Sequence, residues 1–225
     1  MNIKVACVAV CALASGGVLA DTIDASYTGV AGGTGAAHVR VEGHTYYAGH
    51  MNHTIESGDR AGEHFATFCI DFSETAIQKQ STYEIVDIAD APMPGTPYGQ
   101  TIADSINAVV ANAVALGWID NKLQADTDQQ DYLAKMGAIQ AAIWEAFGSG
   151  VEIDNRRTNT GLASYYHILM DSETFDSSRR VQGLRAMVAE GQQDMLVVVP
   201  LPPAAFAGLG MLGSLASVRA IRRRA

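Results

Sequence analysis

The stretch "EHFATFCIDF", residues 63–72, alternates apolar side chains with other residues at the spacing of a β-strand. The predicted apolar face consists of Phe68, Ile70 and Phe72. The opposite face carries Cys69 and Asp71. The pattern therefore predicts a strand that holds a thiol and a carboxylate on the same side.

The chain around this strand changes from strand-like to helical patterns. Strands are predicted at residues 38–49 with a turn at Gly43, at 81–88 and at 194–199, and helices at 102–113, 127–147, 162–170 and 179–190. Strands that precede most of the helices favour an α+β fold. We expect a β-sandwich or barrel with an inserted helical part that carries a central glutamine.

The helix predicted at residues 127–147, "TDQQDYLAKMGAIQAAIWEAF", places Gln140 in an apolar stripe. "TDQQ" predicts a capping box at its start, and Gly148 follows its predicted end. Gly137, one turn before Gln140, would allow another segment to come close. A buried carboxamide needs hydrogen-bond partners, so a structural glutamine bonded to a backbone loop is one interpretation of Gln140.

Both ends of the chain differ from the middle. Residues 1–20 contain Lys4, an apolar run and "VLA" before Asp21, as in a secretory signal peptide. Residues 200–225 contain "PLPP", a charge-free run and an arginine cluster. With Val199, this tail resembles the PEP-CTERM sorting signals, in a VPLPP variant. That resemblance implies a transmembrane span cut by an exosortase-type enzyme in a bacterium with an outer membrane, so that the membrane is contacted only transiently.

Removal of both ends would change charge and cysteine content. Ten basic residues would then face 24 acidic ones, a net charge of −14, which argues against nucleic acid and anionic membranes as partners. Cys7 and Cys11 would leave with the signal peptide, and Cys69 would remain alone. A lone cysteine in an exported chain is either reactive, paired with another molecule, or an inert buried side chain.

The segments "FCID" and "IQAAIW" together resemble the paired signatures of the bacterial thioester domains of surface adhesins. Phe68 to Asp71 match an aromatic-Cys-hydrophobic-Asp strand. Gln140, Ala142, Ile143 and Trp144 match a helix of the form Thr-Gln-x-Ala-hydrophobic-Trp, with Ile139 in the threonine position. The resemblance covers about residues 26–199. It implies an internal thioester between Cys69 and Gln140, formed with release of ammonia.

This chemistry accounts for the types of residue in the two motifs. A thiolate is a good nucleophile and a good leaving group, and an amine that attacks the thioester ends as a stable amide of Gln140. Phe68 and Trp144 are predicted to exclude water from the bond. Asp71 is predicted either to orient a neighbouring group or accept a proton, or to have only a structural role.

The sequence therefore predicts an exported surface or matrix protein in which residues 21–199 form one domain. This domain would bind a target covalently in a single turnover, through an amine of a protein or polysaccharide, and would not be an enzyme. No cofactor or metal is expected, and the histidines of residues 44–53 are expected to be exposed. The alternatives are a non-covalent matrix or carbohydrate-binding protein with an inert Cys69, and a cysteine-dependent hydrolase or acyltransferase.

Overall fold

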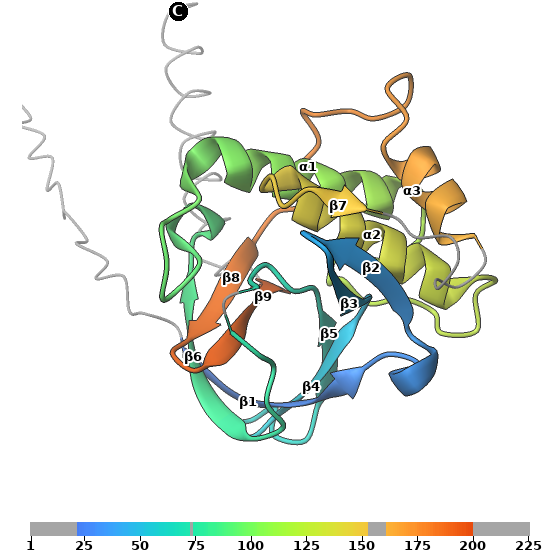
Figure 1. Ribbon diagram of the computed structural model, residues 1–225. Coiled ribbons are helices and arrows are strands. Elements are labelled where there is room, and N and C mark those ends of the chain that lie inside the picture. Colours follow the sequence, from blue (N-terminus) through green and yellow to red (C-terminus); the bar gives the residue numbers. More distant parts are fainter. Residues whose placement is uncertain (1–21, 73, 153–160, 200–225) are drawn as a thin grey trace, which may run out of the picture.

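A computed structural model describes residues 22–72, 74–152 and 161–199 (Figure 1). The predicted signal peptide (residues 1–20) and the predicted sorting signal (residues 200–225) lie outside these ranges. In the part of the chain that is described, no helix has the length and hydrophobicity needed to cross a membrane.

The main sheet is antiparallel and has the strand order β5-β4-β1-β6-β8-β9. Its strands are β1 (Thr22–Val30), β4 (Met51–Ile55), β5 (His64–Thr67), β6 (Gln80–Val86), β8 (Leu184–Ala189) and β9 (Gln192–Val198). The strands curl round one another in Figure 1, and the two edges of the sheet meet at an isolated bridge between Cys69 and Met195. A single bridge is not a continuous ladder, so the sheet is not a closed barrel.

A smaller sheet has the order β3-β2-β7. It consists of β2 (Ala37–Val41), β3 (His44–Ala48) and β7 (Val151–Glu152), and a short 3₁₀ helix, η1 (Gly33–Gly35), precedes it. β2 and β3 form a hairpin whose two turn residues, Glu42 and Gly43, both have positive φ, 50° and 82°. This is the backbone of a tight hairpin turn, so the turn predicted at Gly43 is confirmed.

Three α-helices lie together on one side of the strands (Figure 1). They are α1 (Gly99–Ala115), α2 (Tyr132–Ala146) and α3 (Leu162–Leu169), with a 3₁₀ helix, η2 (Ile88–Asp90), before α1. α2 packs against α1 and α3 and also contacts β2 and β3. The chain is therefore α+β, with helices packed beside antiparallel sheets.

The buried side chains form two apolar clusters, and the segment of Cys69 and α2 are among those that contribute to both. Phe68 and Ile70 belong to the first cluster, between the main sheet and the helices, whereas Cys69 belongs to the second. Likewise α2 gives Ile143 to the first cluster and Trp144 to the second. The predicted alternation along residues 68–70 is thus confirmed. The regular strand β5 is shorter than predicted and ends at Thr67, so residues 68–70, called the Cys69 strand below, continue it only through the isolated bridge at Cys69.

Close contact at Gly137 helps to fix α2. A Cβ atom at this position would lie 2.5 Å from the Cβ of Ala37 in β2 and 2.7 Å from Cδ1 of Leu162 in α3. Real side chains do not approach so closely, so β2 and α3 can sit here only against a glycine. The close approach predicted from Gly137 is confirmed, and the segments that approach it are β2 and α3.

Two predicted elements are wrong. The helix expected at residues 179–190 is instead β8, because Leu184, Ala186 and Val188 alternate into the first cluster and a turn at Gly191, φ 76°, leads to β9. The capping box expected at Thr127 does not form. α2 begins at Tyr132, after Asp131 adopts a left-handed conformation, φ 57°, and makes no side-chain cap.

Candidate functional site: the Cys69–Gln140 contact

The segment that follows β5 holds Cys69 at the junction of the two sheet edges. The Phe68 carbonyl accepts a hydrogen bond from the N–H of Leu196 at 2.8 Å, and the Ile70 N–H donates to the carbonyl of Asp194 at 3.0 Å. Both bonds connect this segment to β9. The backbone on either side of Cys69 is therefore fixed, while the backbone of Cys69 itself faces α2.

The carboxamide of Gln140 pairs with the backbone of Cys69. The Cys69 N–H donates to Oε1 of Gln140 at 2.9 Å, and Nε2 of Gln140 donates to the Cys69 carbonyl at 2.7 Å. The two residues are 71 positions apart in sequence, and they are 2 % and 1 % exposed. We call this pair of hydrogen bonds the Cys69–Gln140 clamp. It brings together the two residues that the sequence singled out.

The thiol of Cys69 is held in an environment that keeps it protonated. Its S–H donates to the Asp71 carbonyl at 2.9 Å, and the Asp71 N–H lies 3.4 Å from the sulfur. The pKa of the thiol is raised to about 12, and burial is the largest cause. The charges of Asp71 and Asp194 also raise it, whereas the hydrogen bond to the Asp71 backbone and the Trp144 indole act in the opposite direction. Reactive cysteines have a lowered thiol pKa, so this thiol does not resemble a resting catalytic nucleophile.

The predicted aromatic shield is only partly placed as expected. Trp144 lies beside the sulfur and influences its pKa, but its Nε1 has no hydrogen-bond partner among the described residues. Phe68 faces the other cluster, where its ring lies 4.7 Å from that of His50. Phe72 and Tyr46 take the predicted place of Phe68, with ring centroids 4.8 Å and 6.1 Å from Trp144. Phe72 therefore does not continue the predicted alternation, because the pairing with β9 ends at Ile70.

Asp71 contacts the thiol through its main chain. Its carbonyl accepts the Cys69 thiol and also Nε2 of Gln193 at 2.9 Å. Its side chain is 4 % exposed, and Oδ2 accepts the N–H of Glu74 at 3.1 Å. These contacts place Asp71 beside the thiol, where either of its predicted roles is open to test.

Two further groups near Cys69 were not predicted. Tyr98, just before α1, donates its hydroxyl hydrogen bond to the Ile70 carbonyl. Asp194 in β9 is 0 % exposed, and burial is the main cause that raises its pKa to about 7. A single acidic residue in the apolar run "DMLVVV" was the available signal for Asp194, whereas nothing in the sequence around Tyr98 distinguishes it.

The histidines of residues 44–53 are not all exposed, contrary to the prediction. His50 and His53 are 1 % and 0 % exposed, and burial lowers the pKa of each to about 4. Nδ1 of His50 lies 3.0 Å from the hydroxyl of Tyr132. Among the described residues, no group of three or more His, Cys, Asp or Glu side chains is arranged to hold a metal ion.

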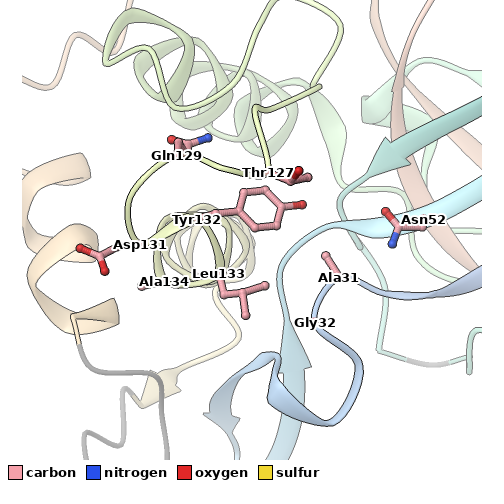
Figure 2. A pocket seen from close by; sticks show the side chains of 9 residues that line it. All are labelled: Ala31, Gly32, Asn52, Thr127, Gln129, Asp131, Tyr132, Leu133 and Ala134. Atoms are coloured by element: carbon pink, nitrogen blue, oxygen red, sulfur yellow. The ribbon is translucent and has the colours of Figure 1, made fainter.

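An open groove lies at the start of α2 (Figure 2). The ring of Tyr132 lies across it, and the groove has a volume of about 640 Å³. Its polar lining includes Asn52, Thr127, Gln129 and Asp131. A second pocket of about 330 Å³ shares Asn52, Thr127 and Tyr132 with it. Neither pocket is lined by Cys69 or Gln140.

Comparisons with known proteins give no relative. No family model matches the chain, no match is found among curated proteins, and none is found among solved structures.

Proposed function

We propose that this protein is an exported covalent binder in which Cys69 and Gln140 condense to an internal thioester. An amine of a target protein or polysaccharide then attacks the thioester, and Gln140 becomes joined to the target through an isopeptide-like amide. Each molecule reacts once, so the protein is not an enzyme. The segment between β6 and β8, which contains α1, α2, β7 and α3, is the helical insertion that carries the glutamine.

The observation that carries this proposal is the clamp itself. Two hydrogen bonds, at 2.9 Å and 2.7 Å, fix the Gln140 carboxamide against Cys69, which carries the buried thiol of the described residues. Holding two reactants in one orientation can contribute roughly 7 to 11 kcal/mol toward their reaction. A strand and a helix packed into two clusters are rigid supports for such an orientation.

The condensation balances without a further reactant. The Cys69 sulfur attacks Cδ of Gln140, the Sγ–Cδ bond forms, and the Cδ–Nε2 bond breaks. The thiol proton and the amide nitrogen leave together as ammonia. The product has no ionisable group at this position, so the burial that raises the thiol pKa to about 12 does not oppose the thioester. Near-complete burial of both residues also protects the bond from water.

A non-covalent binder is the second candidate, and two observations favour it. The clamp pairs both ends of the Gln140 carboxamide, which is also what a purely structural glutamine requires. The groove at Tyr132 is open and lined by several polar side chains, as a site for a polar ligand would be. A cysteine-dependent hydrolase is less well supported, since the thiol pKa is raised and no histidine is among the groups that shift it.

The proposal also includes export. Cleavage after Ala20 and near "VPLPP" would release the domain or attach it outside the cell, at the surface or in the extracellular matrix. Peptide mapping of the exported protein tests this: recovery of an intact segment of residues 204–225 would contradict it.

Labelling with a primary amine tests the covalent function. Methylamine should add to Gln140, and Cys69 should become available to an alkylating reagent at the same time. Labelling of another residue, or a thiol that is alkylated before any amine is added, would favour the non-covalent binder.

A further inference from the structure

The Asp194 carboxylate joins two backbone segments close to Cys69. Its Oδ2 accepts the N–H of Met93 at 2.6 Å, and its Oδ1 accepts the N–H of Ala189 at 3.3 Å. Met93 lies in the loop between η2 and α1, and Ala189 is the last residue of β8. A carboxylate with no exposed surface thus ties this loop to the β8–β9 hairpin.

The loop anchored by Asp194 is hydrogen-bonded to the Cys69 strand through Tyr98, the last residue of the loop. The N–H of Tyr98 donates to the Ala91 carbonyl at 2.8 Å, which closes the loop, and the Tyr98 hydroxyl donates to the Ile70 carbonyl. The Ile70 N–H in turn donates to the main-chain carbonyl of Asp194 at 3.0 Å. Both main-chain groups of the residue after Cys69 therefore bond either to Asp194 or to the end of the loop that Asp194 anchors.

We propose that Asp194 is a positioning residue for the condensation of Cys69 with Gln140, holding the Cys69 strand in register with α2. This inference rests on the proposed function. Asp194 touches neither reacting atom. It acts through Met93, the loop to Tyr98, and Ile70, and it makes these bonds best as the charged carboxylate, since an ionised acceptor forms the stronger hydrogen bonds.

The charge of Asp194 changes in the neutral pH range. Burial is the largest influence on its pKa and raises it to about 7; Asp71 and Glu74 raise it further, while the N–H groups of Met93 and Ala189 lower it. The other titratable groups that interact with it electrostatically are Cys69, Tyr83 and Tyr98, and no cation is among these described groups. A proton on either oxygen weakens the hydrogen bond that this oxygen accepts from Met93 or Ala189. The hold on the Cys69 strand therefore weakens below about pH 7.

The test measures how fast the thioester re-forms. Concentrated ammonia opens the thioester and returns Cys69 and Gln140 to their original side chains, and rapid removal of ammonia starts the condensation again. Intact mass then follows the loss of one ammonia with time at several pH values. The variant is Asp194→Asn, whose amide presents a donor to one of the two N–H groups. Asp128→Asn, an exposed aspartate, is the matched control.

Asp194→Asn should condense roughly tenfold or more slowly than the wild type above pH 7, since small displacements of reacting groups cost large factors in rate. The ratio of wild-type to variant rates should fall toward one as the pH drops through about 7. Asp128→Asn should match the wild type at every pH. Equal rates for Asp194→Asn and the wild type, or a ratio that does not change with pH, would overturn the proposal.

A second measurement does not need the thioester. Hydrogen exchange at the Met93 and Ile70 amides should be faster in Asp194→Asn, and in the wild type it should show a pH dependence centred near 7 beyond the intrinsic one. Equal exchange rates in the variant and the wild type would refute the positioning role. If the variant cannot be purified, a wild-type exchange profile without a pH dependence centred near 7 would refute it. A wild type that never loses ammonia but shows this exchange pattern would refute the proposed function and leave Asp194 as an anchor of the strand alone.

Discussion

The start of α2, called here the open end, and its middle at Gln140, called the closed end, differ in almost every respect that matters for reactivity. At its start, Tyr132 lies in an open groove of about 640 Å³ whose walls are partly polar and partly apolar. At Gln140, about 12 Å further along the helix axis, the side chain is 1 % exposed and makes one hydrogen bond at each end of its carboxamide to the backbone of Cys69. The open end offers recognition without a reactive group, and the closed end offers reactive groups without space for a ligand. A covalent function therefore requires the closed end to open for a small part of the time.

Of the variants proposed, those that remove a reacting residue should have the largest effect on methylamine labelling at the closed end. Cys69→Ala and Gln140→Ala should each abolish methylamine labelling, because one half of the thioester is missing. Gln192→Ala is the matched control: Gln192 is also 1 % exposed, but it bonds to the Ile77 N–H and not to a cysteine. Peptide mapping after labelling should find the Gln140 adduct in this control. Persistent labelling of Cys69→Ala would break the link between the clamp and the chemistry.

Gly137→Ala should show how strongly the closed end depends on packing. Its Cβ would overlap Ala37 and Leu162, so the free energy of unfolding should fall by about 1 to 3 kcal/mol, partly offset by the better helix propensity of alanine. Gly35→Ala meets no atom within 4 Å and should be nearly neutral. Urea unfolding measures both. A Gly137→Ala variant as stable as the wild type would show that α2 can move away from β2 at little cost.

The buried acid at the closed end should give stability a distinctive pH dependence. The folded-state pKa of Asp194 is about 7, above its ordinary value of 3.8, so the folded chain retains a proton that the unfolded chain loses. Burial therefore costs the ionised form more than its stronger hydrogen bonds to Met93 and Ala189 recover. The net contribution of Asp194 to the free energy of unfolding is fully present below about pH 4 and is lost as the pH rises through 7. His50 and His53, with lowered pKa values of about 4, act in the opposite direction in this window.

The difference between the wild type and Asp194→Asn isolates this contribution. Urea unfolding at several pH values should show the wild type losing stability relative to the variant between about pH 4 and 7. A difference that is constant across this range would mean that Asp194 is ionised throughout.

The open end should give the smallest effect. Tyr132→Phe removes the hydroxyl that lies 3.0 Å from Nδ1 of His50 and should cost about 0.5 to 1.5 kcal/mol. The rate of methylamine labelling should not change, since the clamp does not involve Tyr132. Loss of labelling in this variant would mean that the groove and the clamp are coupled, which would remove the distinction between the two ends.

The sequence predicted which two residues meet at the site better than it predicted their surroundings. Cys69 and Gln140 could be paired because the segments that carry them resemble the two signatures of the thioester domains, and because a thiol and a carboxamide can condense. The contacts of Asp194 and Tyr98 depend on how β9 and the loop before α1 meet the Cys69 strand, and such long-range register is not encoded in local patterns. For the same reason, the sequence could not predict that Phe72, and not Phe68, lies beside Trp144.

The spacing of apolar residues was also ambiguous in one place. The run at residues 184–189 is short and mostly apolar, and such a run fits a helix and a strand equally well until its partners are known. The pairing with β6 and β9 decides for the strand. The α+β class was predictable because it depends only on the order of the elements.

The intact mass of the folded, exported protein tests the central claim most directly. The account predicts a chain one ammonia lighter than its processed sequence requires, with a Cys69 thiol that resists alkylation under native conditions until an amine is added. The alkylation control is necessary because burial alone would also protect the thiol. A chain of full mass would contradict the thioester and leave the Cys69–Gln140 clamp as a structural contact.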